Sequence, residues 1–475
     1  MKKYYLGIDL GSTTSKAVII NEKDEIVGRG ITNTRANYKI AADIAREESI
    51  YDARFTLIEK RVQENQSSDR PEFKKYLEDL KNVFKYGQFK RRMDSLEKML
   101  IHTVENFTYE NKNAILQKLK TIIETIRPQI HHEFIYEMLG TKNQFFRDIV
   151  SEKYNAEVAT VGAEFYEPFM LAFDKSITPI ENEMVSYNFK ELVVESMKIL
   201  DEKYQGLADE QEDKSKEDWY YAELNALKDN FKNITYTLRQ HIEAIADEEI
   251  NIANMVGTGY GRALLPFPEE CIKSEILCHA FGAHAVFPNT RTVLDIGGQD
   301  TNAIQVDSHG LVTSFHMNDR CAAGCGRYLG YIADEFGLSL NELGPEALNA
   351  TRETTICSTC TVFAGSEVKE LLHNGEERPN ILAGLHKAIV QRAMSLIARS
   401  GGVRNEFTFT GGVARNQAVL KYVKQMVTEA YGEVTMNIHT DSIFMGALGA
   451  AMFARRNIQI SLPKAQKSEV HETIE

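Results

Sequence analysis

The stretch that decides the fold is residues 4–35, YYLGIDLGSTTSKAVIINEKDEIVGRGITNTR. An apolar run leads to Asp9, a Gly-Ser-Thr-Thr turn follows, and a second apolar run ends at Ile20. The polar residues EKDE separate it from a third run over 26–32. Short runs of β-branched residues between Gly- or Asp-containing turns are typical of antiparallel strands. The stretch therefore predicts three consecutive strands with an aspartate near the end of the first.

The same pattern recurs at residues 291–315, RTVLDIGGQDTNAIQVDSHGLVTSF. The two stretches overlay without a gap, so that Asp9 falls on Asp295 and Gly11 on Gly297, each pair 286 positions apart. A repeat of supersecondary structure at so long a period indicates two duplicated halves. We therefore expect an α/β fold with a duplicated core, in which two similar hairpins face each other.

The residues between the two hairpins have a different character. From about residue 37 to residue 249 apolar residues recur at three- and four-residue steps, as in KKYLEDLKNVFKYGQFKRRMDSLEKML, which predicts amphipathic helices. We interpret this segment as a helical insertion large enough to form its own domain. The predicted division is a first half (1–36, 250–289 and a C-terminal helix at about 441–457), the insertion (37–249), a second half (290–440) and a disordered tail (461–475).

The two hairpins suit a magnesium nucleotide. Glycine lets backbone amides approach phosphate oxygens, and Ser and Thr hydroxyls add hydrogen bonds. A carboxylate can hold Mg²⁺ through water or orient the attacking water. Asp9, Asp295 and Gln299 are therefore the predicted catalytic residues. The predicted phosphate-binding residues are Gly11, Ser12, Thr13, Thr14 and Lys16 in the first hairpin and Gly297, Gly298 and Asp300 in the second.

A third glycine-containing element lies at residues 406–426, EFTFTGGVARNQAVLKYVKQM. A short strand ends at Gly411 and Gly412 and leads into a helix, so bare backbone lies beside a helix N-terminus, where a nucleoside or phosphate can bind. We expect both glycines to contact adenosine. The stretch VGTGYGRALL (256–265) lacks the dinucleotide-binding spacing, and a turn between domains explains it at least as well.

Composition excludes several classes of protein. The net charge of −13 and the sequence pI near 5.5 argue against a nucleic-acid partner, because phosphate-backbone binders need a basic face. The N-terminus leads directly into a strand pattern instead of a secretory signal, and no run of 18 apolar residues predicts a membrane span. We therefore expect a cytoplasmic protein without structural disulfides.

At these motifs the chain resembles the actin-like ATPases, with their actin/hexokinase/acetate-kinase-like core. DLGSTTSK, LDIGGQD and FTGGVARNQ look like the first phosphate, second phosphate and adenosine motifs of that superfamily. NDRCAAGCGR (318–327) and CTVFAGSEV (360–368) are similar to one branch only, the BadF/BadG/BcrA/BcrD-type ATPases. That branch holds the activator ATPases of 2-hydroxyacyl-CoA dehydratases and the ATP-hydrolysing subunits of class I benzoyl-CoA reductases. The resemblance covers residues 1–36 and 250–460.

The resemblance implies a [4Fe–4S] cluster shared across a dimer, with two thiolates from each subunit. The matching positions here are Cys321 and Cys360, and Gly324 is expected beside the nucleotide. We expect Cys321 at the start of a helix, where free amides and the helix dipole lower a thiolate pKa. Cys325 and Cys357 do not match the family's ligands, and a Cys₄ zinc site within one chain stays open as an alternative.

The start of the insertion, GRGITNTRANYKIAADIAREESIYDARF (28–55), resembles the larger ATPase subunit of the benzoyl-CoA reductases. This resemblance implies an ATP-hydrolysing subunit that passes electrons from reduced ferredoxin to substrate-binding iron–sulfur subunits, which dearomatise benzoyl-CoA. Its other implied partner is a homologous or identical ATPase subunit. Two alternatives stay open: an ATP-dependent activator of a 2-hydroxyacyl-CoA dehydratase, and a non-redox small-molecule kinase or nucleotide-gated binding protein of the same superfamily.

Overall fold

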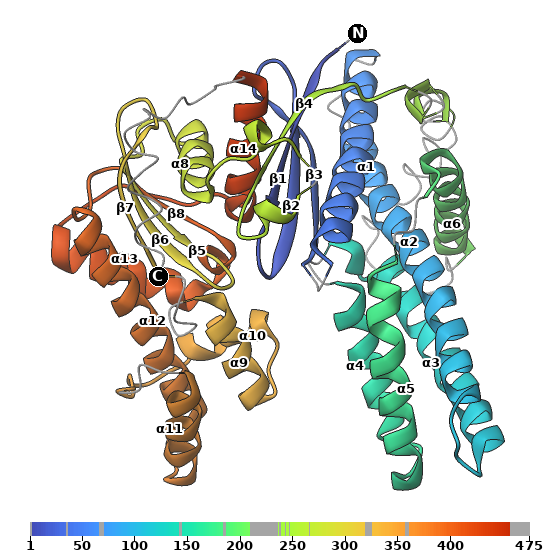
Figure 1. Ribbon diagram of the computed structural model, residues 1–475. Helices are drawn as coiled ribbons and strands as arrows, with labels where there is room; N and C mark the ends of the chain where they lie inside the picture. The colour runs from blue at the N-terminus through green and yellow to red at the C-terminus, as the bar shows by residue number, and fades with distance from the viewer. Residues whose placement is uncertain are drawn as a thin grey trace. The chain divides into compact units, whose positions relative to one another are not determined.

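The computed structural model shows a chain of two compact units, residues 1–50 with 250–475 and residues 51–249 (Figure 1). The structure describes residues 2–34, 37–65, 71–141, 145–183, 187–209, 236, 239–242, 244–246, 248–265, 267–318, 325–356 and 361–456. The predicted disordered tail, 461–475, lies outside these residues, as do Cys321, Gly324, Cys357 and Cys360.

The first sheet carries the first hairpin. It has the order β3-β2-β1-β4, with β2 antiparallel and β4 parallel to the central strand β1. The strands are β1 (Tyr4–Leu10), β2 (Thr14–Ile20), β3 (Ile26–Asn33) and β4 (Ile252–Thr258). The three strands predicted from the opening stretch are confirmed, and β4 joins them from beyond the insertion.

The second sheet repeats this arrangement in the order β7-β6-β5-β8-β9. Its strands are β5 (Thr292–Ile296), β6 (Thr301–Val306), β7 (Val312–Asn318), β8 (Phe407–Thr410) and β9 (Met436–Asn437). Again the central strand, β5, pairs antiparallel with its hairpin partner β6 and parallel with a strand from much later in the chain, β8. The predicted duplicated α/β core is therefore confirmed.

Two helices, α8 (Glu275–Val286) and α14 (Met445–Arg456), pack against each other between the sheets (Figure 1). Small residues make this close packing possible. A Cβ on Gly7 of β1 would overlap the backbone of Ala447 in α14, and a Cβ on Gly449 would overlap the backbone of Cys278 in α8. As a result α8 lies near both hairpins.

The outer helices of the second half are α9 (Gly326–Phe336), α10 (Leu340–Leu348), α11 (Thr361–His373), α12 (Arg378–Ser400) and α13 (Gln417–Tyr431). Within the described part of the chain, α12 alone is long and apolar enough to cross a membrane. Its side chains Ile381, Leu385 and Ile389 are fully buried in the core of the second half, so we interpret α12 as a core helix.

The insertion is helical, as predicted. Its helices are α1 (Tyr38–Asn65), α2 (Pro71–Glu105), α3 (Lys112–Tyr136), α4 (Phe146–Val158), α5 (Ala163–Glu181) and α6 (Phe189–Asp209). Helix α1 begins in the first unit and ends in the second. The second unit has apolar cores of its own, one of them built around the packed rings of Phe55, Phe84 and Phe189, which is why it forms a separate unit.

Candidate functional site

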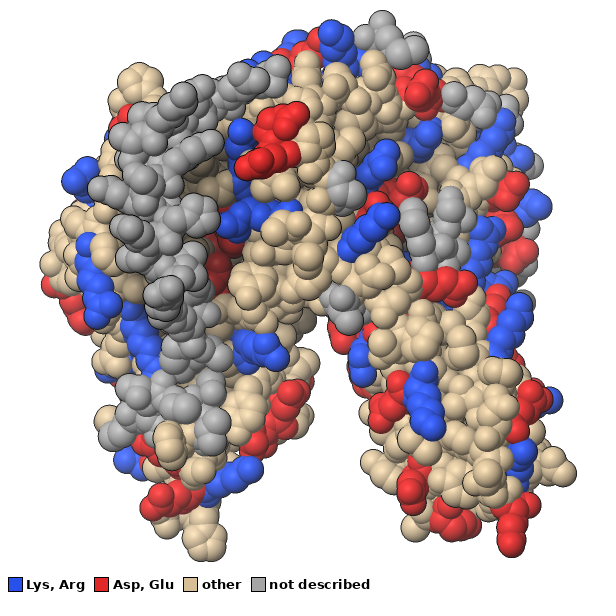
Figure 2. Space-filling model, viewed as in Figure 1, with Lys and Arg blue, Asp and Glu red and all other residues tan. Residues whose placement is uncertain are grey.

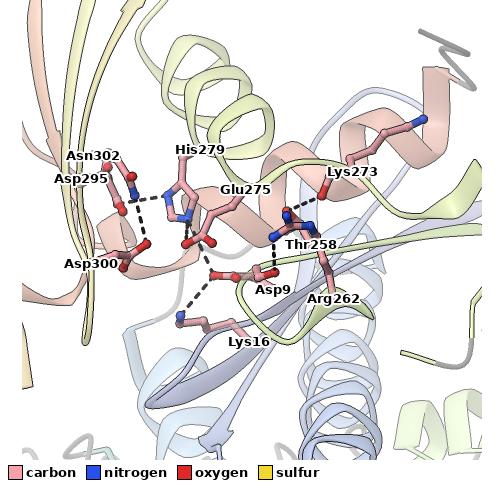
Figure 3. A network of polar contacts seen from close by, with 12 residues as sticks. Asp9, Lys16, Thr258, Arg262, Lys273, Glu275, His279, Asp295, Asp300 and Asn302 are labelled. Carbon is pink, nitrogen blue, oxygen red and sulfur yellow. Dashed lines mark hydrogen bonds and ion pairs between the residues drawn. The ribbon is translucent and has the colours of Figure 1, made fainter. Parts of the chain in front are cut away.

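The candidate site lies where the central parallel strands of the two sheets end. Parallel strands present their carboxyl ends at one edge of a sheet, and ligands bind there in open α/β sheets. In the first sheet Asp9 at the end of β1 lies beside Thr258 at the end of β4. In the second sheet Asp295 lies beside Thr410 in the same way. Figure 3 shows the polar side chains that gather around the two aspartates.

Asp9 is almost completely buried, with 1% of its surface exposed, and is paired with a lysine. Lys16 Nζ donates a hydrogen bond to Asp9 Oδ2 at 3.1 Å. Burial alone would lower the pKa of Lys16, but the charge and hydrogen bond of Asp9 outweigh it and raise that pKa. Among the residues that the structure describes, no hydrogen-bond partner is found for the buried Asp9 Oδ1. One oxygen of this carboxylate is therefore held, and the other is left for a ligand.

Asp295 is equally buried but has different partners. Thr410 Oγ1 donates a hydrogen bond to Asp295 Oδ1 at 2.8 Å, and His279 Nδ1 lies 3.0 Å from the same oxygen. Burial alone would raise the pKa of Asp295, but His279 and Thr410 outweigh it and lower that pKa. Asp295 is thus an ionised carboxylate whose Oδ1 accepts one hydrogen bond from Thr410 and forms an ion pair with His279.

His279, from helix α8, lies between the two aspartates. Besides its contact with Asp295, its Nε2 atom is 4.0 Å from Asp9 Oδ2 and 3.9 Å from Glu275 Oε1. Burial opposes protonation, but the charge of Asp295, with smaller contributions from Asp9 and Glu275, raises the pKa of His279 to about 10. The ring is therefore an imidazolium at neutral pH, and it links the hairpin of one half with the hairpin of the other.

Two further carboxyl groups complete the cluster. Burial, and then the nearby charge of Asp300, raises the pKa of Glu275 to about 8. The pKa of Asp300 is raised by burial and by Asp295, although Asn302 Nδ2 donates a hydrogen bond to Asp300 Oδ2 at 3.2 Å. Burial and the neighbouring acidic groups therefore raise the pKa of both carboxyl groups.

The turns that sequence analysis assigned to phosphate binding lie close together. Gly11, Ser12 and Thr13 form the turn between β1 and β2, and residues 297–300 form the one between β5 and β6. A Cβ on Gly298 would overlap the hydroxyl of Thr13, so the two turns meet at their tips. Thr14 is the first residue of β2, and Gln299 is partly exposed in the second turn.

The VGTGYGR stretch belongs to the site, and its interpretation as a turn between domains is wrong. Gly259 follows β4 with φ of +91°, and Gly411 follows β8 with φ of +86°. A Cβ on Gly259 would lie 2.5 Å from Asp9 Oδ1, and one on Gly411 would overlap the carbonyl of Ile296. Only glycine adopts this backbone without strain, so the two strand ends are equivalent loops at the aspartates.

The adenosine candidates Gly411 and Gly412 begin a loop that a buried histidine supports. Asn416 accepts hydrogen bonds from the first amides of α13, Ala418 N and Val419 N, both at 3.0 Å. Its Nδ2 donates to His386 Nε2 at 3.1 Å, and His386 Nδ1 lies 2.6 Å from the carbonyl of Leu382. Burial lowers the pKa of His386 to about 4, so this ring stays neutral and accepts from Asn416.

The second phosphate turn is tied to the helix that follows the first cysteine motif. Gly326 N donates to Gly297 O at 2.9 Å, and Arg327 N donates to Gly298 O at 2.7 Å. Helix α9 begins at Gly326, with the buried Cys325 preceding it. The expected helix start at Cys321 lies outside the described residues. The carbonyls of the turn satisfy amides that a helix start leaves without partners. Helix α11 begins directly after Cys360.

The charges of the site fit Mg²⁺ bound together with a nucleotide. Four carboxyl groups, Asp9, Glu275, Asp295 and Asp300, lie around the two cations Lys16 and His279. No group of three His, Cys, Asp or Glu side chains could by itself hold a metal in the described part of the chain. Mg²⁺ is usually held by one or two carboxylates, waters and substrate phosphates, and Asp9 Oδ1 offers such an oxygen.

Sequence analysis did not predict Glu275 and His279. The signal for them is present in EILCH (275–279), where these two polar residues lie four positions apart and are separated only by Ile, Leu and Cys. That spacing places them on one face of a helix. Their role depends on the packing of α8 between the two sheets, which only the tertiary structure reveals.

The chain is similar in sequence to known proteins. Residues 6–454 match the model of the BadF/BadG/BcrA/BcrD ATPase family. A 2-hydroxyisocaproyl-CoA dehydratase activator from Clostridioides difficile is 40% identical over 206 residues, 43% of this chain and 74% of that protein. The (R)-2-hydroxyglutaryl-CoA dehydratase activating ATPase of Acidaminococcus fermentans is 40% identical over 43% of this chain and 76% of that protein. A benzoyl-CoA reductase subunit of Thauera aromatica is 34% identical over 37% of this chain and 62% of that protein.

Proposed function

Because the chain belongs to the BadF/BadG/BcrA/BcrD ATPase family, we propose that it is the ATP-dependent activator of a 2-hydroxyacyl-CoA dehydratase. The relatives named as dehydratase activators are more similar to it than the benzoyl-CoA reductase subunit, in identity and in the share of the relative that is matched. These relatives therefore favour the activator. The first expectation from the sequence was the reductase subunit.

One observation supports a connection between ATP hydrolysis and electron transfer. The turn at Gly297 and Gly298 is hydrogen-bonded to the start of α9, the helix that follows the NDRCAAGCGR motif. A change in the turn when a phosphate binds or leaves would move those carbonyls, and with them the first amides of α9. A change in the bound nucleotide would thus alter the position of the helix next to the cysteine motif through these two hydrogen bonds.

The residues of the site have separate roles in this proposal. Asp9 and Asp295 would hold hydrated Mg²⁺ and the attacking water, and the two glycine-rich turns would bind phosphates. Lys16 would balance charge at the first hairpin. Cys321 and Cys360 of two copies of the chain would hold a [4Fe–4S] cluster, which supplies one-electron chemistry at low potential. Reduced ferredoxin as donor and a dehydratase as acceptor complete the proposed set of partners.

A benzoyl-CoA reductase subunit is the second candidate, because the start of the insertion (28–55) resembles that of the larger ATPase subunit of these reductases. Chain length does not separate the candidates, since the 175 matched residues make up 62% of the T. aromatica subunit, which is about as short as the activators. The 206 residues matched to the C. difficile activator make up 74% of that protein, which is therefore far shorter than this chain of 475 residues. The helical unit of residues 51–249 accounts for much of the additional length. We assign this unit no activity of its own.

The test is the amount of ATP used for each turnover. The protein, isolated without oxygen and reduced by a one-electron donor, is mixed with ATP and a purified (R)-2-hydroxyglutaryl-CoA or 2-hydroxyisocaproyl-CoA dehydratase that lacks its own activator. We expect many dehydrations for each ATP hydrolysed, because one injected electron supports many turnovers. Cys321→Ala and Cys360→Ala should lose iron and activation but keep ATP binding, and Cys271→Ala is the matched control.

Other outcomes would contradict the proposal. A fixed number of ATP molecules hydrolysed for each electron delivered to benzoyl-CoA, in the presence of reductase subunits, would show that the second candidate is correct. A colourless, iron-free protein after anaerobic isolation would indicate a kinase or a nucleotide-gated binding protein.

A further inference from the structure

Helix α8 supplies a side chain that the established motifs of the site do not include. His279 comes from the first half of the core, yet its Nδ1 atom lies 3.0 Å from Asp295 of the second half (Figure 3). Lys16 and Asn302, which occupy equivalent positions on β2 and β6, are both directed elsewhere, to Asp9 and Asp300. His279 is therefore the cation of the site that contacts the second aspartate.

The ring has little freedom to leave this position. It is 5% exposed, and a Cβ on Gly446 of α14 would lie 2.7 Å from Nε2, so the backbone of α14 closes one side. Glu275 lies 3.9 Å away along the same helix, and Asp9 lies 4.0 Å away. Confinement of this kind pre-organises a group, so that no reorientation is needed during the reaction.

The two ring nitrogens face different halves of the molecule. Nδ1 forms an ion pair with Asp295 Oδ1 at 3.0 Å and faces the second half, although its N–H is not aligned for a hydrogen bond in this structure. Nε2 faces Asp9 and Glu275 at distances beyond a direct hydrogen bond. Thr410 also donates to Asp295 Oδ1. Both contacts fall on one oxygen and leave Asp295 Oδ2 to act on water or on hydrated Mg²⁺.

We propose that His279 is a positioning residue for ATP hydrolysis, which acts through its Nδ1 atom by fixing Asp295 in the orientation that the reaction requires. This role rests on the proposed function only in assigning ATP hydrolysis to this site. His279 contacts carboxylates and is not assigned to the nucleotide. Its loss should therefore slow turnover and leave nucleotide affinity almost unchanged.

Two amide substitutions separate the two nitrogens. Asparagine places its NH₂ group close to where histidine carries Nδ1, whereas glutamine extends its NH₂ group toward the position of Nε2. We expect His279→Asn to keep kcat within about threefold of the original protein. We expect His279→Gln to lower kcat by about 10- to 100-fold, the usual effect of removing an outer partner of a metal-site carboxylate. KM for ATP should change by less than about threefold in both variants, because binding and turnover respond to different interactions.

The matched control is His284→Gln, the same substitution five residues later on the same helix. His284 packs against Gly310 and is influenced by Arg291, Asp307 and His309 instead of the site carboxylates. We expect it to keep the original kcat. Thermal unfolding and the affinity for a non-hydrolysable ATP analogue, measured for every variant, show which of them are folded and bind nucleotide.

The measurements can overturn the role of Nδ1. If folded His279→Asn and His279→Gln lose kcat equally, or if the glutamine variant is the more active, side-chain volume or the Nε2 side is what matters and the proposal is wrong. Unchanged kcat in both variants would also refute it, with the proposed function untouched. Absence of ATP hydrolysis in the original protein would refute the ATPase assignment itself, and the positioning role with it.

Discussion

The two halves of the core have the same backbone and different charges. In each half an aspartate ends the central strand, a hairpin partner lies opposite it, and a parallel strand ends in threonine and glycine. Opposite Asp9 the hairpin carries Lys16, which forms an ion pair with it. Opposite Asp295 the hairpin carries Asn302, and the cation comes from His279 on α8.

This difference shows what a duplicated ATP site keeps and what it can change. Register and the two positive-φ glycines are kept, because they determine where the backbone approaches the ligand. The source of the compensating charge has changed, since any cation that reaches the carboxylate performs that task. In the first half the hairpin itself supplies the cation that pairs with its aspartate. In the second half that cation comes from helix α8, which packs between the sheets.

The largest expected effect tests the backbone equivalence. Gly259→Ala and Gly411→Ala should each abolish measurable ATP hydrolysis and reduce the free energy of unfolding by about 2–5 kcal/mol, because positive φ and overlap with the opposite strand add together. Gly375→Ala is the control: its φ is +82°, but no atom lies within 4 Å of the added Cβ. We expect it to reduce stability by about 1 kcal/mol through strain alone. Urea unfolding and an ATPase assay measure both effects, and equal loss in all three variants would contradict the prediction.

A second experiment breaks the ion pair of the first half. Asp9→Asn leaves Lys16 buried without its partner and should reduce the free energy of unfolding by about 3 kcal/mol. The double variant Asp9→Asn/Lys16→Met should recover part of this loss, because the uncompensated charge is gone. Asp295→Asn should reduce stability less, since His279 can release its proton.

The comparison between these aspartate variants is made by urea unfolding at pH 7. If Asp295→Asn destabilises the protein as much as Asp9→Asn, the two halves do not differ in the way that the charges indicate. Both single variants should lose at least about 100-fold in kcat, because each removes a carboxylate from the site of hydrolysis.

A third experiment uses pH to test the loop after β8. The pKa of His386 is lowered from 6.5 to about 4 by burial, so the unfolded chain binds a proton between these values that the folded chain does not. Stability contributed by the neutral ring is thus complete above pH 6.5 and is lost as pH falls toward 4, by about 3 kcal/mol in total. His386→Gln should remove this component from the acid unfolding curve. An unchanged pH dependence would show that His386 is not the group that titrates.

The smallest expected effect separates the two threonines. Thr410→Val removes a hydrogen bond to an ionised carboxylate and should lower kcat about 10-fold, equivalent to about 1.4 kcal/mol. Thr258→Val removes a hydrogen bond to the carbonyl of Lys273 and should change kcat by less than about twofold. Steady-state kinetics on both variants test this, and the reverse order would mean that the threonines have the opposite roles.

The surface of the molecule adds little to this comparison. Figure 2 shows basic and acidic side chains interspersed over the face in view, although the whole chain carries a net charge of −13.

The sequence by itself determined the elements that depend on local physics. The hairpin at residues 4–35 and its repeat at 291–315 could be predicted because alternating apolar runs and glycine turns specify strands, and an undisturbed spacing reveals duplication. The helical insertion could be predicted because its apolar residues recur at three- and four-residue steps. Asp9 and Asp295 were predicted as catalytic residues because a carboxylate in a glycine-rich hairpin suits a magnesium nucleotide, and this role stays a prediction.

The tertiary structure alone decided the partners of those aspartates. Thr258 comes next to Asp9 across 249 positions of sequence, and His279 reaches Asp295 only because the small residues of α14 allow α8 to pack between the sheets. The start of α9 likewise depended on which carbonyls were available to its amides. Contacts of this kind depend on how elements distant in sequence pack, and no local pattern of residue types determines that packing.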